Sequence, residues 1–238
     1  MHGGRALSFS LAEIQKRKFR AVLFDLDGTL VEFKFNLKDS RVAIIKWLSI
    51  NGYDISNISS ETKTQKIFDI IRLQCESEKG THKNYGAARQ SMSDILEDFE
   101  FKAFSETKPH SGSLTLLKTL KEEQYLTAIV TNSGHKPVFS ILGEFGFAPF
   151  VSTIITRDEM VKLKPEPDGI IKALELLNVT REESMFVGDS VIDIQAAHKA
   201  GVTSVALSQG MSSAHVLARE EPDYLISTIE EVGDIIHS

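Results

Sequence analysis

Residues 21–30 read Ala-Val-Leu-Phe-Asp-Leu-Asp-Gly-Thr-Leu, an apolar run that ends in two carboxylates two positions apart. The run 21–24 predicts a buried β-strand, and Asp25 and Asp27 fall where that strand passes into a loop. Charged groups beside a hydrophobic core are costly unless something pairs with them. A divalent cation, a phosphoryl group or both would supply the partner, so this stretch predicts a polar site at the end of the first strand.

Strands and helices alternate along most of the chain. Short runs rich in β-formers predict strands at 21–24, 126–130, 153–155, 184–187, 202–206 and 224–226. Patterns of helical period between and after them predict helices at 113–122, 138–145, 169–177, 192–200 and 228–236. This alternation indicates an α/β fold, a Rossmann-like, doubly wound parallel sheet with helices on both faces.

Residues 33–107 break this rhythm, because they contain no convincing pair of strands. Three apolar faces of helical period lie there, at Ile44/Trp47/Leu48, Ile67/Ile70/Ile71 and Met92/Ile95/Leu96/Phe99. The segment therefore predicts an all-α module inserted after the first strand. We expect a catalytic α/β core domain of residues 1–32 and 108–238, and a helical cap domain of residues 33–107.

Composition narrows the classes of protein that the chain can represent. The 238 residues carry a net charge of −6, which argues against nucleic acid or an anionic membrane as the main partner. No apolar run approaches the ~20 residues that cross a bilayer, and residues 1–20 lack the roughly 7–15-residue apolar core of a secretion signal. We expect a cytoplasmic protein. The single Cys75 excludes an internal disulfide and a cysteine-built metal site.

Three further polar clusters follow later strands, at the sheet edge where open α/β folds bind ligands. They are Thr131-Asn132-Ser133, Lys164-Pro165-Glu166-Pro167 and Gly188-Asp189-Ser190-Val191-Ile192-Asp193. A hydroxyl and backbone N–H groups at a helix start suit phosphate oxygens, and two carboxylates four apart can share a hard cation. Taken alone, the clusters around Thr131 and Asp189 would be interpreted as helix N-caps, and a surface lysine beside prolines indicates almost nothing. The four clusters in this order indicate a common site.

The order Asp-x-Asp-Gly-Thr, Thr-Asn-Ser, Lys-Pro-x-Pro and Gly-Asp-Ser-x-x-Asp resembles the four motifs of the haloacid dehalogenase-like hydrolase superfamily. The resemblance extends from about Arg20 to the C-terminus, apart from the insertion. The position and helical character of that insertion resemble the cap of the phosphoglycolate phosphatase-like branch. Gly169 is a small departure, because relatives often carry another residue after Pro-Asp.

The resemblance implies a role for each motif residue. Asp25 would be the nucleophile that forms an aspartyl-phosphate, and Asp27 the acid that protonates the leaving group and then activates water. Mg²⁺ would bind Asp25, the main-chain carbonyl of Asp27, Asp189 and Asp193, the last directly or through water. The groups that would hold the transferring phosphoryl oxygens are those of Thr131, Asn132, Ser133 and Lys164.

These roles predict a phosphoric monoester hydrolase that acts on a small phosphorylated metabolite. A sugar phosphomutase or a pyrophosphatase of the same superfamily, and a non-catalytic binding scaffold, are the alternatives. Monomer and homodimer are both open. The cap residues that contact the substrate are candidates by type alone: Arg41, Arg72, His82, Lys83, Tyr85 and Arg89.

Overall fold

The central sheet of the molecule has six strands in the order β5-β4-β1-β6-β7-β8, and every neighbouring pair is parallel. A computed structural model describes residues 17–32, 35–77 and 84–238. The strands are β1 (Ala21–Phe24), β4 (Leu126–Val130), β5 (Thr153–Ile155), β6 (Ser184–Gly188), β7 (Thr203–Leu207) and β8 (Tyr224–Ile226). The predicted Rossmann-like parallel sheet is confirmed.

Strand β1 shows how the sheet separates two layers of core. Its four residues are fully buried, and alternate side chains enter opposite apolar clusters, Ala21 and Leu23 in one and Val22 and Phe24 in the other. Burial of a Leu or Phe side chain stabilises the fold by about 1.5–3 kcal/mol. The first cluster includes residues of α7 (Asp168–Leu177) and α8 (Val191–Ala200). The second includes residues of α5 (Ser113–Glu122), α6 (His135–Glu144) and α10 (Val232–Ile236).

Most predicted elements agree with the structure to within one residue, and two differ more. Helix α6 begins at His135, three residues before the predicted start. Pro137 lies in its first turn. Proline is tolerated there because it lacks a backbone N–H, and N–H groups in the first turn have no acceptor within the helix. The predicted helix 228–236 is a 3₁₀ turn, Ile229–Glu231, followed by the short helix α10. The short helix α9 (Ala214–Ala218) precedes β8 and was not predicted.

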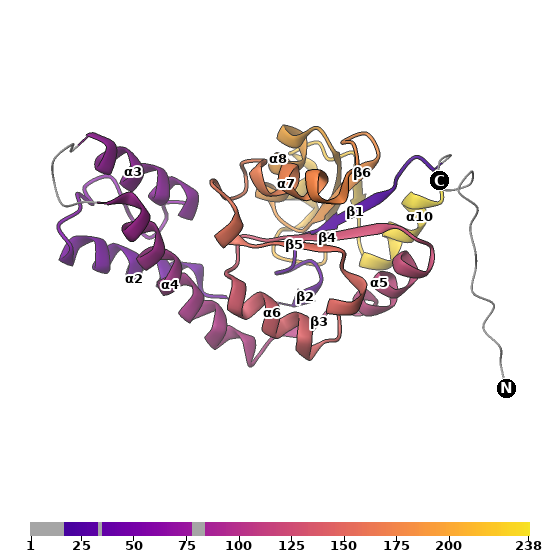
Figure 1. Ribbon diagram of the computed structural model, residues 1–238, viewed down its shortest axis with the longest axis horizontal. Coiled ribbons are helices and arrows are strands. Elements are labelled where there is room, and N and C mark those ends of the chain that lie inside the picture. The colour runs from indigo at the N-terminus through magenta and orange to yellow at the C-terminus, as the bar shows by residue number, and fades with distance from the viewer. Residues whose placement is uncertain (1–16, 33–34, 78–83) are drawn as a thin grey trace.

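The inserted module is helical in the part of the chain that the structure describes. It contains α2 (Leu37–Ile50), α3 (Thr64–Ser77) and α4 (Tyr85–Phe104). Six residues of the predicted apolar faces are buried: Ile44, Leu48, Ile67, Ile71, Met92 and Leu96. The other four, Trp47, Ile70, Ile95 and Phe99, are partly buried, and Phe68 and Ala88 are buried without having been predicted. Figure 1 shows the three helices grouped at one end of the molecule, with α4 running back toward the sheet. The candidates His82 and Lys83 lie outside the described residues.

The chain crosses between the sheet and the helical module twice, and the two crossing segments form a short antiparallel β-ladder. Strand β2 (Val31–Glu32) lies antiparallel to β3 (Lys108–Pro109), and the amide of His110 donates to the carbonyl of Leu30. So short a ladder has no periodic signature, which is why the sequence did not predict it. The division into domains at 32/33 and 107/108 stays a prediction. No helix among the described residues is long and apolar enough to cross a membrane.

Candidate active site

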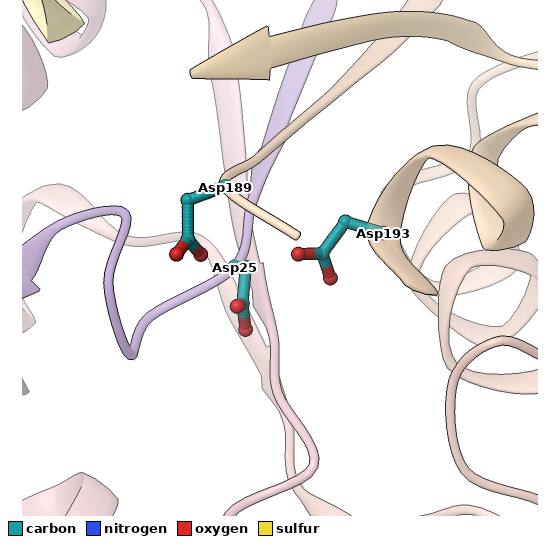
Figure 2. Close-up of side chains that lie close together, drawn as sticks. All are labelled: Asp25, Asp189 and Asp193. Atoms are coloured by element: carbon teal, nitrogen blue, oxygen red, sulfur yellow. The ribbon is translucent and has the colours of Figure 1, made fainter. Parts of the chain in front are cut away.

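Three carboxylates meet at the carboxyl edge of the sheet. Asp25 follows β1, Asp189 follows β6, and Asp193 lies in the first turn of α8. Figure 2 shows the three side chains gathered there, and one oxygen from each lies within 4.8 Å of the others. All three residues are buried. The chain leaves β1 toward β4 on one side and returns to β6 on the other, so this is the switch point where such sheets bind ligands.

Lys164 is the cation that faces this cluster. Its Nζ lies 2.7 Å from Oδ1 of Asp25 and 2.6 Å from Oδ1 of Asp193, and its side chain is 2% exposed. Burial alone would lower the pKa of Lys164, but Asp193 and Asp25 together hold that pKa above its ordinary value. The lysine is therefore charged and compensates part of the negative cluster.

The backbone of Lys164 is clamped by Asn132. The side-chain oxygen of Asn132 accepts from the amide of Lys164 at 2.9 Å, and its nitrogen donates to the carbonyl of the same residue at 3.1 Å. The sequence predicts that Asn132 contacts phosphate. In the structure the side-chain amide of Asn132 ties the loop after β4 to the loop that carries Lys164, and its contact to phosphate stays a prediction.

The acids of the cluster share one electrostatic environment. Burial raises the pKa of Asp25 well above its ordinary value, although the charge of Lys164 lowers it. Burial, and then repulsion from Asp193, raises the pKa of Asp189 to about 6. These are the shifts expected where several carboxylates lie together with one cation. The set still lacks positive charge, and its oxygen-only donors suit a hard divalent ion.

Asp189 is held by groups from two other loops. It accepts hydrogen bonds from the Thr29 hydroxyl at 3.1 Å and from the Met211 amide at 2.5 Å. A Cβ on Gly28 or on Gly210 would overlap its carboxylate, and Gly28 also has a φ of +93°. Neither Met211 nor Gly210 was predicted. A backbone amide leaves no signature in the sequence, and the close approach of Gly210 to Asp189 depends on tertiary packing.

Asp193 uses both of its oxygens. Oδ1 accepts from Lys164, while Oδ2 accepts from the amide of Ser190 at 3.0 Å and from its hydroxyl. The bond from the Ser190 amide to Asp193 is one half of a capping box that starts α8; in the other half the Ser190 side chain accepts from the Asp193 amide. The carboxylate that the sequence assigns to a metal is thus also part of the helix cap, which fixes its position.

Asp27 lies beside the first group and accepts from two hydroxyls. Thr131 Oγ1 donates to Asp27 Oδ2 at 3.1 Å, and the Ser133 hydroxyl donates to the same oxygen. The other oxygen, Oδ1, is buried without a hydrogen-bond partner. Burial raises the pKa of Asp27 to about 6, opposed by the hydrogen bond from Ser133. A carboxyl with this pKa can hold or release a proton near neutral pH.

A cavity of about 650 Å³ opens over these residues and is roofed by the helical module. Its floor is lined by seven of the eight residues that the sequence assigns to the site: Asp25, Asp27, Thr131, Asn132, Ser133, Lys164 and Asp189. The eighth, Asp193, does not line the cavity but contacts Lys164. The roof of the cavity carries three basic side chains, Arg41 of α2, Lys63 just before α3, and Lys66 within α3. Of these, only Arg41 was among the predicted candidates.

The other described candidates from the helical module have different places. Arg72 pairs with Asp69 at 3.4 Å. Arg89 donates to the backbone carbonyls of Arg157 and Met160, and so joins the module to the core. Neither they nor Tyr85 line the cavity, whereas Lys63 and Lys66 do. Residue type alone could not show which basic side chains line the cavity, because basic residues on helices are usually solvated.

Comparison with known proteins identifies the family. The family model described as haloacid dehalogenase-like hydrolase matches residues 22–207. The chain therefore belongs to the haloacid dehalogenase-like hydrolases, as the four motifs predict.

Curated relatives and solved structures match most of this chain. It is 32% identical over 220 residues to "Putative pyrophosphatase PpaX" of Caldanaerobacter subterraneus, which covers 92% of this chain and 95% of that protein. It is 27% identical to a phosphoglycolate phosphatase of Pseudomonas savastanoi over 90% of this chain and 78% of the relative. A crystal structure titled as a predicted phosphoglycolate phosphatase of Haemophilus somnus superposes with a TM-score of 0.61 at 23% identity, covering 92% of this chain and 99% of that one.

Proposed function

We propose that this protein is a Mg²⁺-dependent phosphatase that hydrolyses a small phosphorylated metabolite through an aspartyl-phosphate. One observation carries the proposal. The carboxylate of Asp25 lies buried at the floor of a cavity, 2.7 Å from the Lys164 ammonium and within 4.8 Å of two further carboxylates. Membership of a hydrolase family and relatives named as phosphatases and pyrophosphatases support it.

Asp25 would act as the nucleophile. Its oxygen forms a bond to phosphorus while the bond from phosphorus to the leaving oxygen breaks, and Asp27 gives its proton to that oxygen. The unpartnered Oδ1 of Asp27 suits this task because the other oxygen is held by Thr131 and Ser133. Asp27, now ionised, takes a proton from water. The resulting hydroxide attacks phosphorus, releases phosphate and restores Asp25.

The remaining residues would position charge. Lys164 is buried beside Asp25 and would neutralise phosphoryl oxygens as negative charge shifts onto them. Asp25, Asp189, Asp193 and the main-chain carbonyl of Asp27 would hold Mg²⁺, which lets the anionic nucleophile and substrate approach each other. The oxygen-only donors and the raised pKa values fit such an ion.

We expect Mg²⁺ to raise the melting temperature more at about pH 7.5 than at about pH 5. Asp27 and Asp189 have pKa values of about 6 in the fold, above the ordinary 3.8. The stability that these groups contribute is therefore present at low pH and is lost as the pH rises through about 6. Mg²⁺ competes with protons and offsets that loss. Thermal melts with Mg²⁺ or chelator at both pH values test this, and equal shifts would contradict it.

The roof of the cavity bears on the substrate class. Arg41, Lys63 and Lys66 line it, and no ion pair to any of the three is found among the described residues. Asp69, which also lines the roof, is already paired with Arg72. A roof with excess positive charge favours a substrate that carries a second anionic group beyond the phosphate under attack.

Loss of the roof cations is therefore expected to raise KM selectively. We expect Lys63→Gln and Arg41→Gln to lower kcat/KM for phosphoglycolate or pyrophosphate by about 10-fold, and for an aryl phosphate without a second anionic group by about 2-fold or less. The matched control is Lys46→Gln, on the exposed side of α2 and away from the cavity. Equal loss on both substrates would show that the roof does not select for charge.

The main test is a screen for Mg²⁺-dependent release of phosphate. It compares an aryl phosphate with phosphoglycolate, sugar phosphates, nucleotides and pyrophosphate. Hydrolysis of one metabolite at least about 100-fold faster than the rest would define the substrate. Interconversion of sugar phosphates without release of phosphate would favour a mutase. Absence of any turnover by folded, Mg²⁺-loaded protein would favour a binding scaffold and reject the proposal.

A further inference from the structure

A bidentate ion pair is buried between the helical module and the core. Glu100, near the end of α4, contacts Arg157, in the turn that follows β5, with an Oε1–Nη1 distance of 2.6 Å and an Oε2–Nη2 distance of 3.1 Å. The two side chains are 4% and 1% exposed. Burying two charges costs nearly as much as their attraction returns, so such a pair is weak evidence of a role in stability alone.

The same two side chains hold the backbone of the loop that follows β4. Glu100 Oε2 accepts from the amide of Gly134 at 2.9 Å, and Arg157 Nη1 donates to the carbonyl of Asn132 at 2.8 Å. The amide of Arg157 donates to the carbonyl of Ser133 at 3.0 Å. Three consecutive residues of this loop, 132–134, are thus bound by the pair.

That loop carries the groups on which the proposed chemistry depends. Ser133 lies between the two bonded positions, and its hydroxyl donates to Asp27. Thr131 precedes them and donates to the same carboxylate. Asn132 clamps the backbone of Lys164. A shift of the loop would therefore move the acid and the phosphoryl-binding lysine together.

Helix α4 approaches this loop directly. Arg157 Nη2 also donates to the carbonyl of Ser93 in α4, at 3.2 Å. A Cβ on Gly134 would lie 2.7 Å from Arg157 Nη2 and 2.8 Å from an oxygen of Glu97, closer than side chains normally pack. Glycine at this position lets the helix and the loop meet without an intervening side chain.

We propose that Glu100 and Arg157 are positioning residues, an ion pair through which the helical module sets the geometry of loop 131–134 and so of the catalytic floor. The inference rests on the proposed function for its effect on rate, but not for its effect on the loop. It assigns a part in the reaction to a residue of the helical module that lies outside all four sequence motifs. Placement of reacting groups within an ångström is worth about 100-fold in rate.

The test compares two glutamates one turn apart on α4. Glu100→Gln removes the buried charge and keeps the shape. Glu97→Gln removes the partner of Lys136, a second ion pair between module and core whose lysine is 79% exposed. We expect Glu100→Gln to lower kcat for an aryl phosphate by about 100-fold with KM changed less, and Glu97→Gln to stay within about 2-fold of wild type.

A double variant separates positioning from stability. Glu100→Gln leaves Arg157 buried without its counter-charge, whereas Glu100→Gln/Arg157→Met removes both charges, and such replacements often restore stability. We expect the double variant to regain melting temperature but not kcat. Recovery of kcat together with melting temperature would overturn the inference, because the pair would then be merely structural.

Hydrogen exchange of residues 131–135 gives a readout that does not need turnover. We expect faster exchange at Gly134 in Glu100→Gln than in Glu97→Gln, since the Gly134 amide loses its carboxylate acceptor. Unchanged exchange and unchanged kcat in folded Glu100→Gln would reject the inference. Faster exchange in a protein whose wild type releases no phosphate would reject the proposed function while leaving the placement of the loop by Glu100 supported.

Discussion

Asp25→Asn is expected to lower steady-state release of phosphate by about 10⁴-fold or more, because the amide cannot act as the nucleophile. The defect should appear in kcat for activated and unactivated substrates alike, since both need the same bond to phosphorus. Single-turnover assays with an aryl phosphate measure it directly. Turnover near the wild-type rate by a verified Asp25→Asn protein would reject the aspartyl-phosphate mechanism.

The variant should stay folded, which makes the result interpretable. Asp25 is buried, and burial raises its pKa well above the ordinary value, so its charge opposes folding. Lys164 keeps its 2.6 Å contact to Asp193 when the Asp25 charge is removed. We therefore expect a melting temperature without Mg²⁺ at least equal to that of wild type. A melting temperature far below wild type would assign Asp25 a structural role as well.

Asp27→Asn is expected to have the second largest effect, and an effect that depends on the leaving group. General acid–base catalysis is worth about 10²–10⁴-fold. An alkyl phosphate needs a proton on its leaving oxygen, so its phosphorylation step should slow by that factor. An aryl oxygen leaves with little help, so its phosphorylation step should slow far less.

The geometry around Asp27 makes this variant a clean probe. Thr131 and Ser133 donate to one oxygen of Asp27, and the carbonyl of an asparagine can accept the same two hydrogen bonds. The change therefore falls on the unpartnered oxygen that we assign to proton transfer. Rapid quench with alkyl and aryl phosphates separates phosphorylation of Asp25 from its hydrolysis. Equal slowing of phosphorylation for both substrates would deny Asp27 the role of acid.

The roof variants Lys63→Gln and Arg41→Gln and the α4 variant Glu100→Gln, each with its matched control, test two different functions of the helical module. The roof variants test whether the cavity selects substrates with a second anionic group. The Glu100 variant tests whether α4 fixes the position of loop 131–134. If roof variants alter the ratio of specificity constants while Glu100→Gln lowers kcat for every substrate, the helical module acts on the reaction in two separable ways.

Local patterns in the sequence determined the fold class. Continuous apolar runs such as 128–130 indicate strands buried on both faces, and helical periods between them indicate parallel pairing. The same reasoning located Asp25, Thr131, Lys164 and Asp189, because parallel strands bring their carboxyl ends to one edge. These inferences need only neighbours along the chain.

The tertiary structure alone decided which of these groups touch. Lys164 lies between Asp25 and Asp193, and the Met211 amide holds Asp189, across separations that no local pattern encodes. A helical period shows which face of a helix is apolar. It does not show which elements contact the apolar face or the polar face on the other side. For this reason Lys63 on the cavity roof and Glu100 against Arg157 could not be distinguished from ordinary solvated charges. Contacts between segments far apart in the chain depend on how whole elements pack, and only the folded chain contains that information.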